Sequence, residues 1–249
     1  MFGSFFRSTR FKAFAIHLCG SFAFGLVMLW LVFGVWYPAP LHEAVGVTGI
    51  FVMLLAIDVV VGPLLTLLVY KKGKKTLIFD MAVILLLQLS ALIYGVVAVA
   101  EGRPAWLVFN VDRFDVVRAL DIDTRQLDAA SPEYRSAPWA GPQWVGADNP
   151  GDPKQRQALM VESAMGLSDI PQRPELYRPL EKVAPAIRAR ALPLERLSLF
   201  NDPVRVQLEL KPWSKADAWV PLMAGAQPMV VLINKESASV VAIVNLLPW

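Results

Sequence analysis

The feature that most limits how this chain can fold is one long apolar segment, residues 44–70, broken only by Asp58 and Pro63. A cluster of four lysines within residues 71–75 follows it at once. A membrane-spanning helix needs roughly 20 apolar residues, so this segment of 27 residues is long enough to cross a bilayer. Basic residues favour the cytoplasmic side of such a helix. We therefore predict a transmembrane helix over 44–70 that ends in a cytoplasmic basic loop over 71–75.

Two further apolar segments flank this one and set the predicted topology. Residues 13–37 follow a short basic N-terminus, residues 1–12, and residues 77–100 follow the lysine loop. Three basic residues precede the first segment, none lies between the first and second, and four lie between the second and third. This alternation predicts a bacterial inner-membrane protein with a cytoplasmic N-terminus, three transmembrane helices and a periplasmic C-terminal domain, residues 101–249.

The segment after residue 100 mixes strand and helix patterns. The predicted elements are a strand at 106–118, a loop at 131–153, helices at 154–166 and 174–190, and a hairpin of 227–234 with 237–247. Pro179 and Pro185 are expected to interrupt the second helix. The predicted fold class is three transmembrane α-helices followed by a periplasmic α+β domain with a small antiparallel sheet.

Composition and charge exclude several classes of function. Residues 1–99 carry seven basic and three acidic residues, and residues 100–249 carry 17 and 18, so the basic character lies in the short segments beside the membrane. No basic surface with interleaved aromatic residues is predicted, which argues against a nucleic-acid partner. One cysteine and two histidines are too few for the common zinc sites. Nucleophile and phosphate-binding motifs are absent from the sequence, so we predict a protein that is not an enzyme, with no cofactor and no metal.

Acidic residues suggest two candidate sites, one in each half of the chain. A carboxyl group near the middle of a bilayer is costly and needs a partner, and Asp58, Gln88 and Ser21 fall at similar depths in the three predicted helices. With Pro63, which removes a helix hydrogen bond, they form a predicted intramembrane polar site. Two interpretations stay open for it: hydrogen bonding that holds the helices together, and a proton or ligand site.

In the C-terminal half, Asp112, Arg113 and Asp115 lie on or beside the strand predicted at 106–118. A catalytic carboxylate pair is conceivable there. The sequence supplies no histidine or serine motif to complete such a site, so we predict a solvated strand edge.

Several short motifs follow one another in a particular order along the chain. They are Arg10-Phe11-Lys12-Ala13-Phe14 with His17-Leu18, Trp36-Tyr37-Pro38-Ala39-Pro40-Leu41, Asp58-Val59-Val60-Val61-Gly62-Pro63-Leu64-Leu65-Thr66, Gly73-Lys74-Lys75 with Phe79-Asp80, Gly102-Arg103-Pro104, Phe109-Asn110-Val111-Asp112-Arg113-Phe114 and Leu247-Pro248-Trp249. In this order and spacing the chain resembles the type IV pilin accessory proteins of the TfpX/TfpZ kind. The resemblance covers the first 118 residues and the C-terminal hairpin, and residues 120–225 add nothing to it.

The resemblance implies a chaperone-like, non-enzymatic factor that binds a cognate major type IV pilin and promotes its assembly into pili. The lipid bilayer and the pilus assembly platform are its further implied partners, and no catalytic residue is implied. His17 lies at a depth near that expected for a glutamate of the pilin helix and is a candidate pilin contact, although such a histidine more often bonds a backbone carbonyl. Two alternatives stay open: a small membrane sensor or ligand-binding protein with an outer domain, and a transporter component that uses Asp58.

Overall fold

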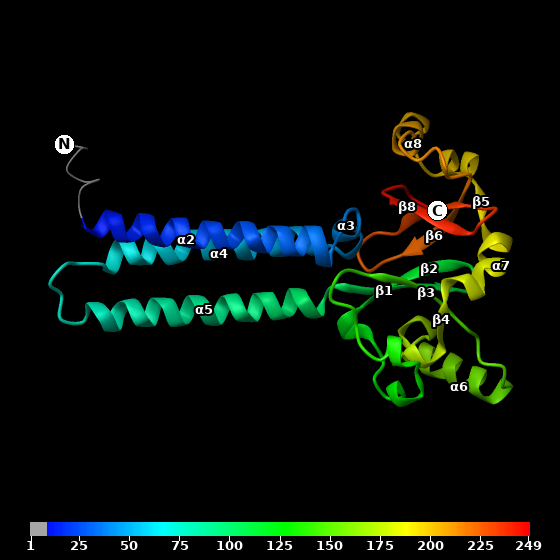
Figure 1. Cartoon of the computed structure of the whole chain (residues 1–249), viewed down its shortest axis with the longest axis horizontal. Coiled ribbons are helices and arrows are strands. Elements are labelled where there is room, and N and C mark those ends of the chain that lie inside the picture. Colours follow the sequence, from blue (N-terminus) through cyan, green and yellow to red (C-terminus); the bar gives the residue numbers. More distant parts are fainter. Residues whose placement is uncertain (1–8) are drawn as a thin grey trace. The chain divides into compact units, whose positions relative to one another are not determined.

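The computed structural model describes residues 9–249, and the chain divides into two compact units (Figure 1). The helical unit contains the chain up to Val35 and Val47–Glu101. The sheet unit contains Trp36–Gly46 and Gly102–Trp249. Residues 1–8 of the predicted basic N-terminus lie outside the described part of the chain. The short segment between the first two long helices therefore belongs to the sheet unit.

Three long helices build the helical unit. They are α2 (Thr9–Leu31), which continues as the π-helical turn η1 (Val32–Trp36), α4 (Val47–Val69) and α5 (Leu77–Glu101). Their mean hydropathy over the most apolar window is 2.2, 2.5 and 2.5, and each is long enough to cross a bilayer, which confirms the predicted membrane helices. Large apolar side chains such as Trp30 and Ile78 point outward with 68% and 86% of their surface exposed. A helix surface of this kind favours contact with lipid over contact with water.

Eight strands form the single sheet of the sheet unit. They are β1 (Pro104–Asn110), β2 (Arg113–Arg118), β3 (Gln143–Ala147), β4 (Tyr177–Pro179), β5 (Leu192–Pro193), β6 (Ala218–Met223), β7 (Met229–Asn234) and β8 (Ser239–Val244). Their order is β4-β3-β1-β2-β6-β7-β8, with β5 paired to β6. The β1–β3 and β2–β6 pairs are parallel, and the remaining pairs are antiparallel. The predicted α+β class with an antiparallel sheet is confirmed, and the sheet reaches well beyond the predicted hairpin.

Short helices surround this sheet. The α-helices are α3 (Leu41–Val45), α6 (Pro153–Ala164), α7 (Leu180–Arg190) and α8 (Pro203–Leu210), and the 3₁₀ turns are η2 (Ala119–Asp121), η3 (Leu127–Ala129), η4 (Pro132–Tyr134), η5 (Ile170–Gln172), η6 (Pro174–Leu176) and η7 (Leu194–Leu199). Both α6 and α8 begin with an Asp-Pro pair, in which the carboxylate of Asp152 or Asp202 accepts main-chain N–H groups of the first turn. Proline is tolerated at the first helical position because its missing N–H would have no partner there.

The sheet is packed on both faces. Met229, Val231 and Ile233 of β7 face one hydrophobic cluster, which α3 and α7 cover. The intervening Val230 and Leu232 face a second cluster, which includes residues of η7 and α8. All five residues are fully buried. A strand covered on both faces reads as a continuous apolar run, which is why β7 shows no alternation in the sequence.

The strand predicted over 106–118 is wrong in extent, because β1 and β2 are two strands joined by a tight turn. Val111 takes a left-handed conformation with φ of 59°, and the N–H of Asp112 donates to the carbonyl of Asn110 at 2.7 Å. The turn contains neither glycine nor proline, the residues by which turns are usually recognised.

Two further predictions differ from the structure around β3 and β4. The helix predicted over 174–190 begins at Leu180, because residues before it form η6 and then β4, which pairs with β3. The loop predicted over 131–153 contains β3, which lies parallel to β1. In β3, Gly146 lies beneath Val183 of α7, where a Cβ atom would come within 2.4 Å of the valine side chain. Glycine weakens a strand signal in the sequence, although here it permits close packing of a helix.

Candidate functional site

A polar contact joins α2 to α4 within the membrane-spanning part of the helical unit. The Nδ1 atom of His17 and the hydroxyl of Thr66 lie 2.7 Å apart. Thr66 is almost completely buried, and His17 is partly buried. The predicted pilin contact is therefore engaged inside its own helical unit through one ring nitrogen.

A second contact, centred on Gln88, joins all three long helices. Its side-chain amide donates to the hydroxyl of Ser21 on α2 at 3.3 Å and to the main-chain carbonyl of Asp58 on α4 at 3.1 Å. The carboxyl group of Asp58 also interacts with this side chain. The structure thus brings together the three residues that the sequence placed at similar depths.

Spacing along the helices explains how these contacts align. His17 and Ser21 are one turn apart on α2, and Asp58, Gly62 and Thr66 follow one another by single turns on α4. Gly62 is the position that lets Gln88 approach, because a Cβ atom there would lie 2.1 Å from the Gln88 side-chain oxygen. A small residue at a helix contact is typical of membrane proteins. These five residues with Gln88 are called the polar seam below.

Pro63 is buried inside α4, and the helix continues through it to Val69. Proline has no N–H to donate to the carbonyl one turn earlier. Membrane helices tolerate this where neighbouring helices supply other contacts. The position of Pro63, next to Gly62 of the polar seam, is consistent with a packing role.

An apolar groove of about 100 Å³ opens beside the polar seam. Residues of α2, α4 and α5 line it, among them Met28, Phe51, Leu92 and Gly95. Among the described residues that line the groove, Asp58 is the one ionisable residue, and its side chain is half-buried. The groove therefore offers an apolar surface with one carboxyl group at its edge.

The segment between α2 and α4 is an integral part of the sheet unit. Leu41 and Ala44 of α3 are 2% and 0% exposed within the first hydrophobic cluster. The carbonyl of Ala44 accepts from the N–H groups of Ala226 and Gln227 at 3.0 and 3.1 Å. The segment Trp36–Gly46 is thus a folded piece of the sheet unit, although it lies far from the rest of that unit along the chain.

Cationic and aromatic side chains surround the start of this connection. Tyr37 is 1% exposed, and burial raises its pKa to about 12 against the opposing positive charges of Arg118 and Arg103. The guanidinium of Arg103 lies 4.0 Å from the centre of the Trp139 ring and donates to the carbonyl of Pro138 at 3.1 Å. Tyr37 and Arg103 stand at the starts of the two segments that form the sheet unit. These contacts therefore bring the starts of both segments into one cluster.

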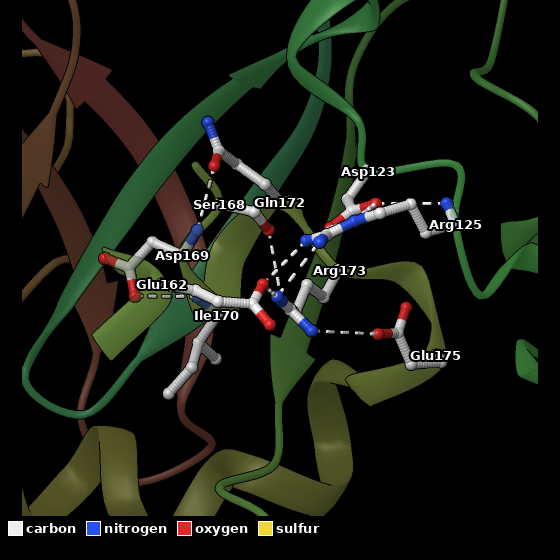
Figure 2. Close-up of polar contacts among 9 residues, drawn as sticks. All are labelled: Asp123, Arg125, Glu162, Ser168, Asp169, Ile170, Gln172, Arg173 and Glu175. Carbon is white, nitrogen blue, oxygen red and sulfur yellow. Dashed lines mark hydrogen bonds and ion pairs between the residues drawn. The ribbon is translucent and has the colours of Figure 1, made fainter. Parts of the chain in front are cut away.

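The most extensive ionic cluster of the sheet unit surrounds Arg173, which is 5% exposed (Figure 2). Its guanidinium pairs with Glu162 of α6, lies 3.8 Å from carboxylate oxygens of Asp123 and Glu175, and donates to Ser168. Because Glu162 is the only one of these partners on α6, the pair ties that helix to the segments around it.

Arg125 completes the cluster by contacting Asp123 and Glu162 at 2.6 and 2.7 Å. Its hydrogen bonds hold the pKa of the Asp123 carboxyl well below its usual range. Burial raises the pKa of Glu175, which has one buried oxygen without a hydrogen-bond partner in the described part of the chain. No sequence pattern indicated this cluster, because its members lie up to 52 residues apart in segments without a recognisable motif.

The acidic residues near the β1–β2 turn are less solvated than predicted. Asp115 has a side chain only 13% exposed, and its partner Arg113 contacts it at 3.1 Å. Burial raises the pKa of Asp115 to about 6. The prediction of a solvated strand edge is therefore wrong for Asp115, although Asp112 is exposed.

The chain is similar in sequence to proteins named for fimbrial assembly. Residues 5–46 match the family described as "Fimbrial assembly protein FimB". A protein named "Fimbrial assembly protein, serogroup E1", from Dichelobacter nodosus, is 35% identical over 185 residues, which cover 74% of this chain and 72% of the relative. The serogroup I protein of the same organism is 34% identical over the same shares, and the protein of serogroups C1 and C2 is 35% identical over 121 residues, 48% of this chain and 92% of its own length. No solved structure matches the chain.

Proposed function

The chain belongs to the fimbrial assembly protein FimB family, and from this membership we propose that it acts in pilus assembly. In this proposal it is a non-enzymatic accessory factor of the TfpX/TfpZ kind that resides in the bacterial inner membrane. The N-terminus lies in the cytoplasm, the helical unit spans the bilayer and the sheet unit lies in the periplasm. The alternation of basic residues along the chain supports this orientation.

Its direct partner is the cognate major type IV pilin before that subunit enters the fibre. A pilin waiting in the membrane presents one long apolar helix and a folded exported part. The chain has one surface suited to each: the apolar groove beside Asp58, and the sheet unit.

The groove is the observation that carries this proposal. Apolar side chains alone give no net attraction between helices in lipid, because lipid tails are equally apolar. Close packing and polar contacts supply the attraction instead. A groove with one carboxyl group offers both close packing and a polar contact to the helix of the pilin. The assembly platform is a second partner, reached when the bound subunit is handed to the growing pilus.

A strain that lacks this protein tests the proposal. We expect the strain to keep its pilin in the membrane while surface pili are strongly reduced, and the intact gene to restore them. The tagged protein should also co-purify with the major pilin from mild detergent. A full complement of surface pili in the deletion strain would refute a role in assembly, and restored pili without co-purification would refute direct binding.

A further inference from the structure

Large apolar side chains are exposed on the outer side of α8 and at the end of η7, which packs beside it (Figure 1). Val204 and Leu208 of α8 are one turn apart on the helix and 64% and 66% exposed. Leu199, the last residue of η7, is 71% exposed. The buried Val206 points to the opposite side of α8, into the cluster that it shares with η7. The outward side chains therefore add nothing to the core of the sheet unit.

The chain after β8 adds to this apolar surface. The side chain of Asn201, between η7 and α8, donates to the carbonyl of Leu247 and accepts from its N–H, both at 2.8 Å. These two bonds hold Leu247, which is 39% exposed, beside the junction of η7 and α8. The α8 patch, as it is called below, consists of Leu199, Val204, Leu208 and Leu247. An exposed apolar patch on a folded domain usually marks contact with a protein or a membrane.

Hydrogen bonds connect α8 to α3, the helix that lies between two membrane-spanning segments. The guanidinium of Arg205 donates to the carbonyl of Asn245 at 2.6 Å. The side-chain amide of Asn245 in turn donates to the carboxylate of Glu43. Glu43 stands four residues before Val47, the first residue of α4, so their Cα atoms lie within about 14 Å of each other. Two hydrogen bonds and four residues of chain thus separate α8 from a membrane helix.

The one charged residue on the outward face of α8 is basic. Lys211 follows Val204 by two helical turns and is exposed. Within residues 9–249 its ammonium group takes part in no ion pair. A lysine can lay its apolar stem along such a surface and keep its charge in the polar layer above it. Apolar side chains bordered by a free ammonium group match the acyl chains and the phosphate groups of a lipid surface.

We propose that the α8 patch docks into the surface of the bilayer that the three long helices cross. Its side chains enter the boundary between headgroups and acyl chains, roughly 5–10 Å deep for an interfacial helix, and Lys211 pairs with a lipid phosphate. Trp249, which is 51% exposed, suits the headgroup level, where tryptophan is enriched. Docking would fix the orientation of the sheet unit on the membrane. The proposal goes beyond a role in pilus assembly and holds for either orientation of the chain.

The connections between the two units favour lipid over a protein partner. The chain passes between the helical unit and the sheet unit three times, at Trp36, Gly46 and Gly102. The sheet unit is therefore held beside the bilayer at all times. A pilin or a second copy of this chain must first be encountered, and until then the patch would remain in water. Lipid covers it in every molecule without such an encounter.

Spin labels on the full-length protein test this docking. The probe membrane is a nanodisc of phosphatidylethanolamine and phosphatidylglycerol that holds one copy of the protein, and serine replaces the free Cys19 in every variant. We expect a nitroxide at Leu208→Cys to be more accessible to oxygen, which concentrates in lipid, than to a water-soluble nickel chelate. The same label at Met160→Cys, an apolar residue of α6 that is 70% exposed, is the matched control and should show the reverse ratio.

Each outcome decides for or against the proposal. Equal access of the chelate to the labels at positions 208 and 160 refutes docking. Shielding of position 208 that appears only with added pilin, or only with two copies in one nanodisc, shows a protein contact and also refutes it. Lys211→Glu should shift the label at position 208 towards the chelate, because anionic phosphates repel the new carboxylate. All the replaced side chains outside the membrane are exposed, so the fold does not depend on them.

Discussion

At the residue scale, Gln88 is the side chain on which the polar seam depends. Replacing it with methionine keeps its length and removes both donated hydrogen bonds. We expect Gln88→Met to destabilise the helical unit by about 0.6–2 kcal/mol, the range measured for hydrogen bonds between membrane helices. Unfolding in mixed micelles measures the change. Leu87→Met, at a neighbouring position 62% exposed, is the control and should have little effect. Equal stability of both variants would mean that the seam adds nothing to helix association.

Asp115 gives the sheet unit a stability that depends on pH. Burial raises its pKa to about 6, above the value near 3.9 expected in the unfolded chain. Between these values the folded state holds a proton that the unfolded state has released, so the free energy of unfolding should fall as pH rises from about 4 to about 6 and level off above. The difference is on the order of 3 kcal/mol. Denaturant titrations across this pH window should show a smaller fall for Asp115→Asn, and the same fall as wild type for Asp128→Asn at an exposed position away from Asp115.

At the scale of elements, α3 lies between the membrane helices α2 and α4 and supplies part of the hydrophobic core of the sheet unit. Leu41 is 2% exposed and packs in the same cluster as Val183 and Ile187 of α7. We expect Leu41→Ala to cost about 2–5 kcal/mol in the free energy of unfolding of the sheet unit, as for other buried leucines. Leu199→Ala, at a leucine 71% exposed, should change it little. If thermal unfolding of the two variants coincides, the connection does not contribute to the core.

The sequence predicted some elements well because their signals are local. The three long helices are uniform apolar runs, and β7 with β8 forms a hairpin within 16 residues. The rest of the sheet depends on contacts distant along the chain. Strand β3 pairs with β1 more than 30 residues earlier, and its sequence, Gln-Trp-Val-Gly-Ala, alternates only weakly. Local patterns cannot show which strand will lie beside such a segment.

The candidate sites also divide into those that local sequence signals predict and those that depend on contacts distant along the chain. Depth along a helix follows from counting residues, so the sequence could group Asp58, Gln88 and Ser21 before any contact was known. Helix rotation does not follow from counting, and the bond between His17 and Thr66 was therefore not predicted. The contacts around Arg173 form only through tertiary packing, and no spacing of residues in the sequence predicts them.

At the scale of the whole molecule, orientation in the membrane is the first property to test. We expect alkaline phosphatase, which is active only outside the cytoplasm, to be active when fused after Ala100 and inactive when fused after Lys75. The reason is the retention of basic segments on the cytoplasmic side. Immunoblots of both fusions control for expression. The reverse pattern of activity would place the sheet unit in the cytoplasm and would exclude contact with the exported part of a pilin.

Selection of the cognate pilin is the second property of the whole molecule, and the division of the chain determines how to test it. The sheet unit comprises Trp36–Gly46 as well as Gly102–Trp249. A transplant from a relative that serves a different pilin must therefore carry both segments. A chimera that exchanges only residues 102–249 would join a foreign sheet to the native α3 and should be less stable, because Leu41 and Ala44 lie in its core.

We expect the chimera with both segments exchanged to assemble the new pilin and to lose activity on the original one. The reason is that an exported part differs between pilins in shape and charge, whereas apolar membrane helices offer fewer distinguishing groups. Counts of surface pili in strains that express either pilin measure the change. A chimera that is stable in the membrane and still serves the original pilin would locate recognition in the helical unit, beside Asp58, and would contradict selection by the sheet unit.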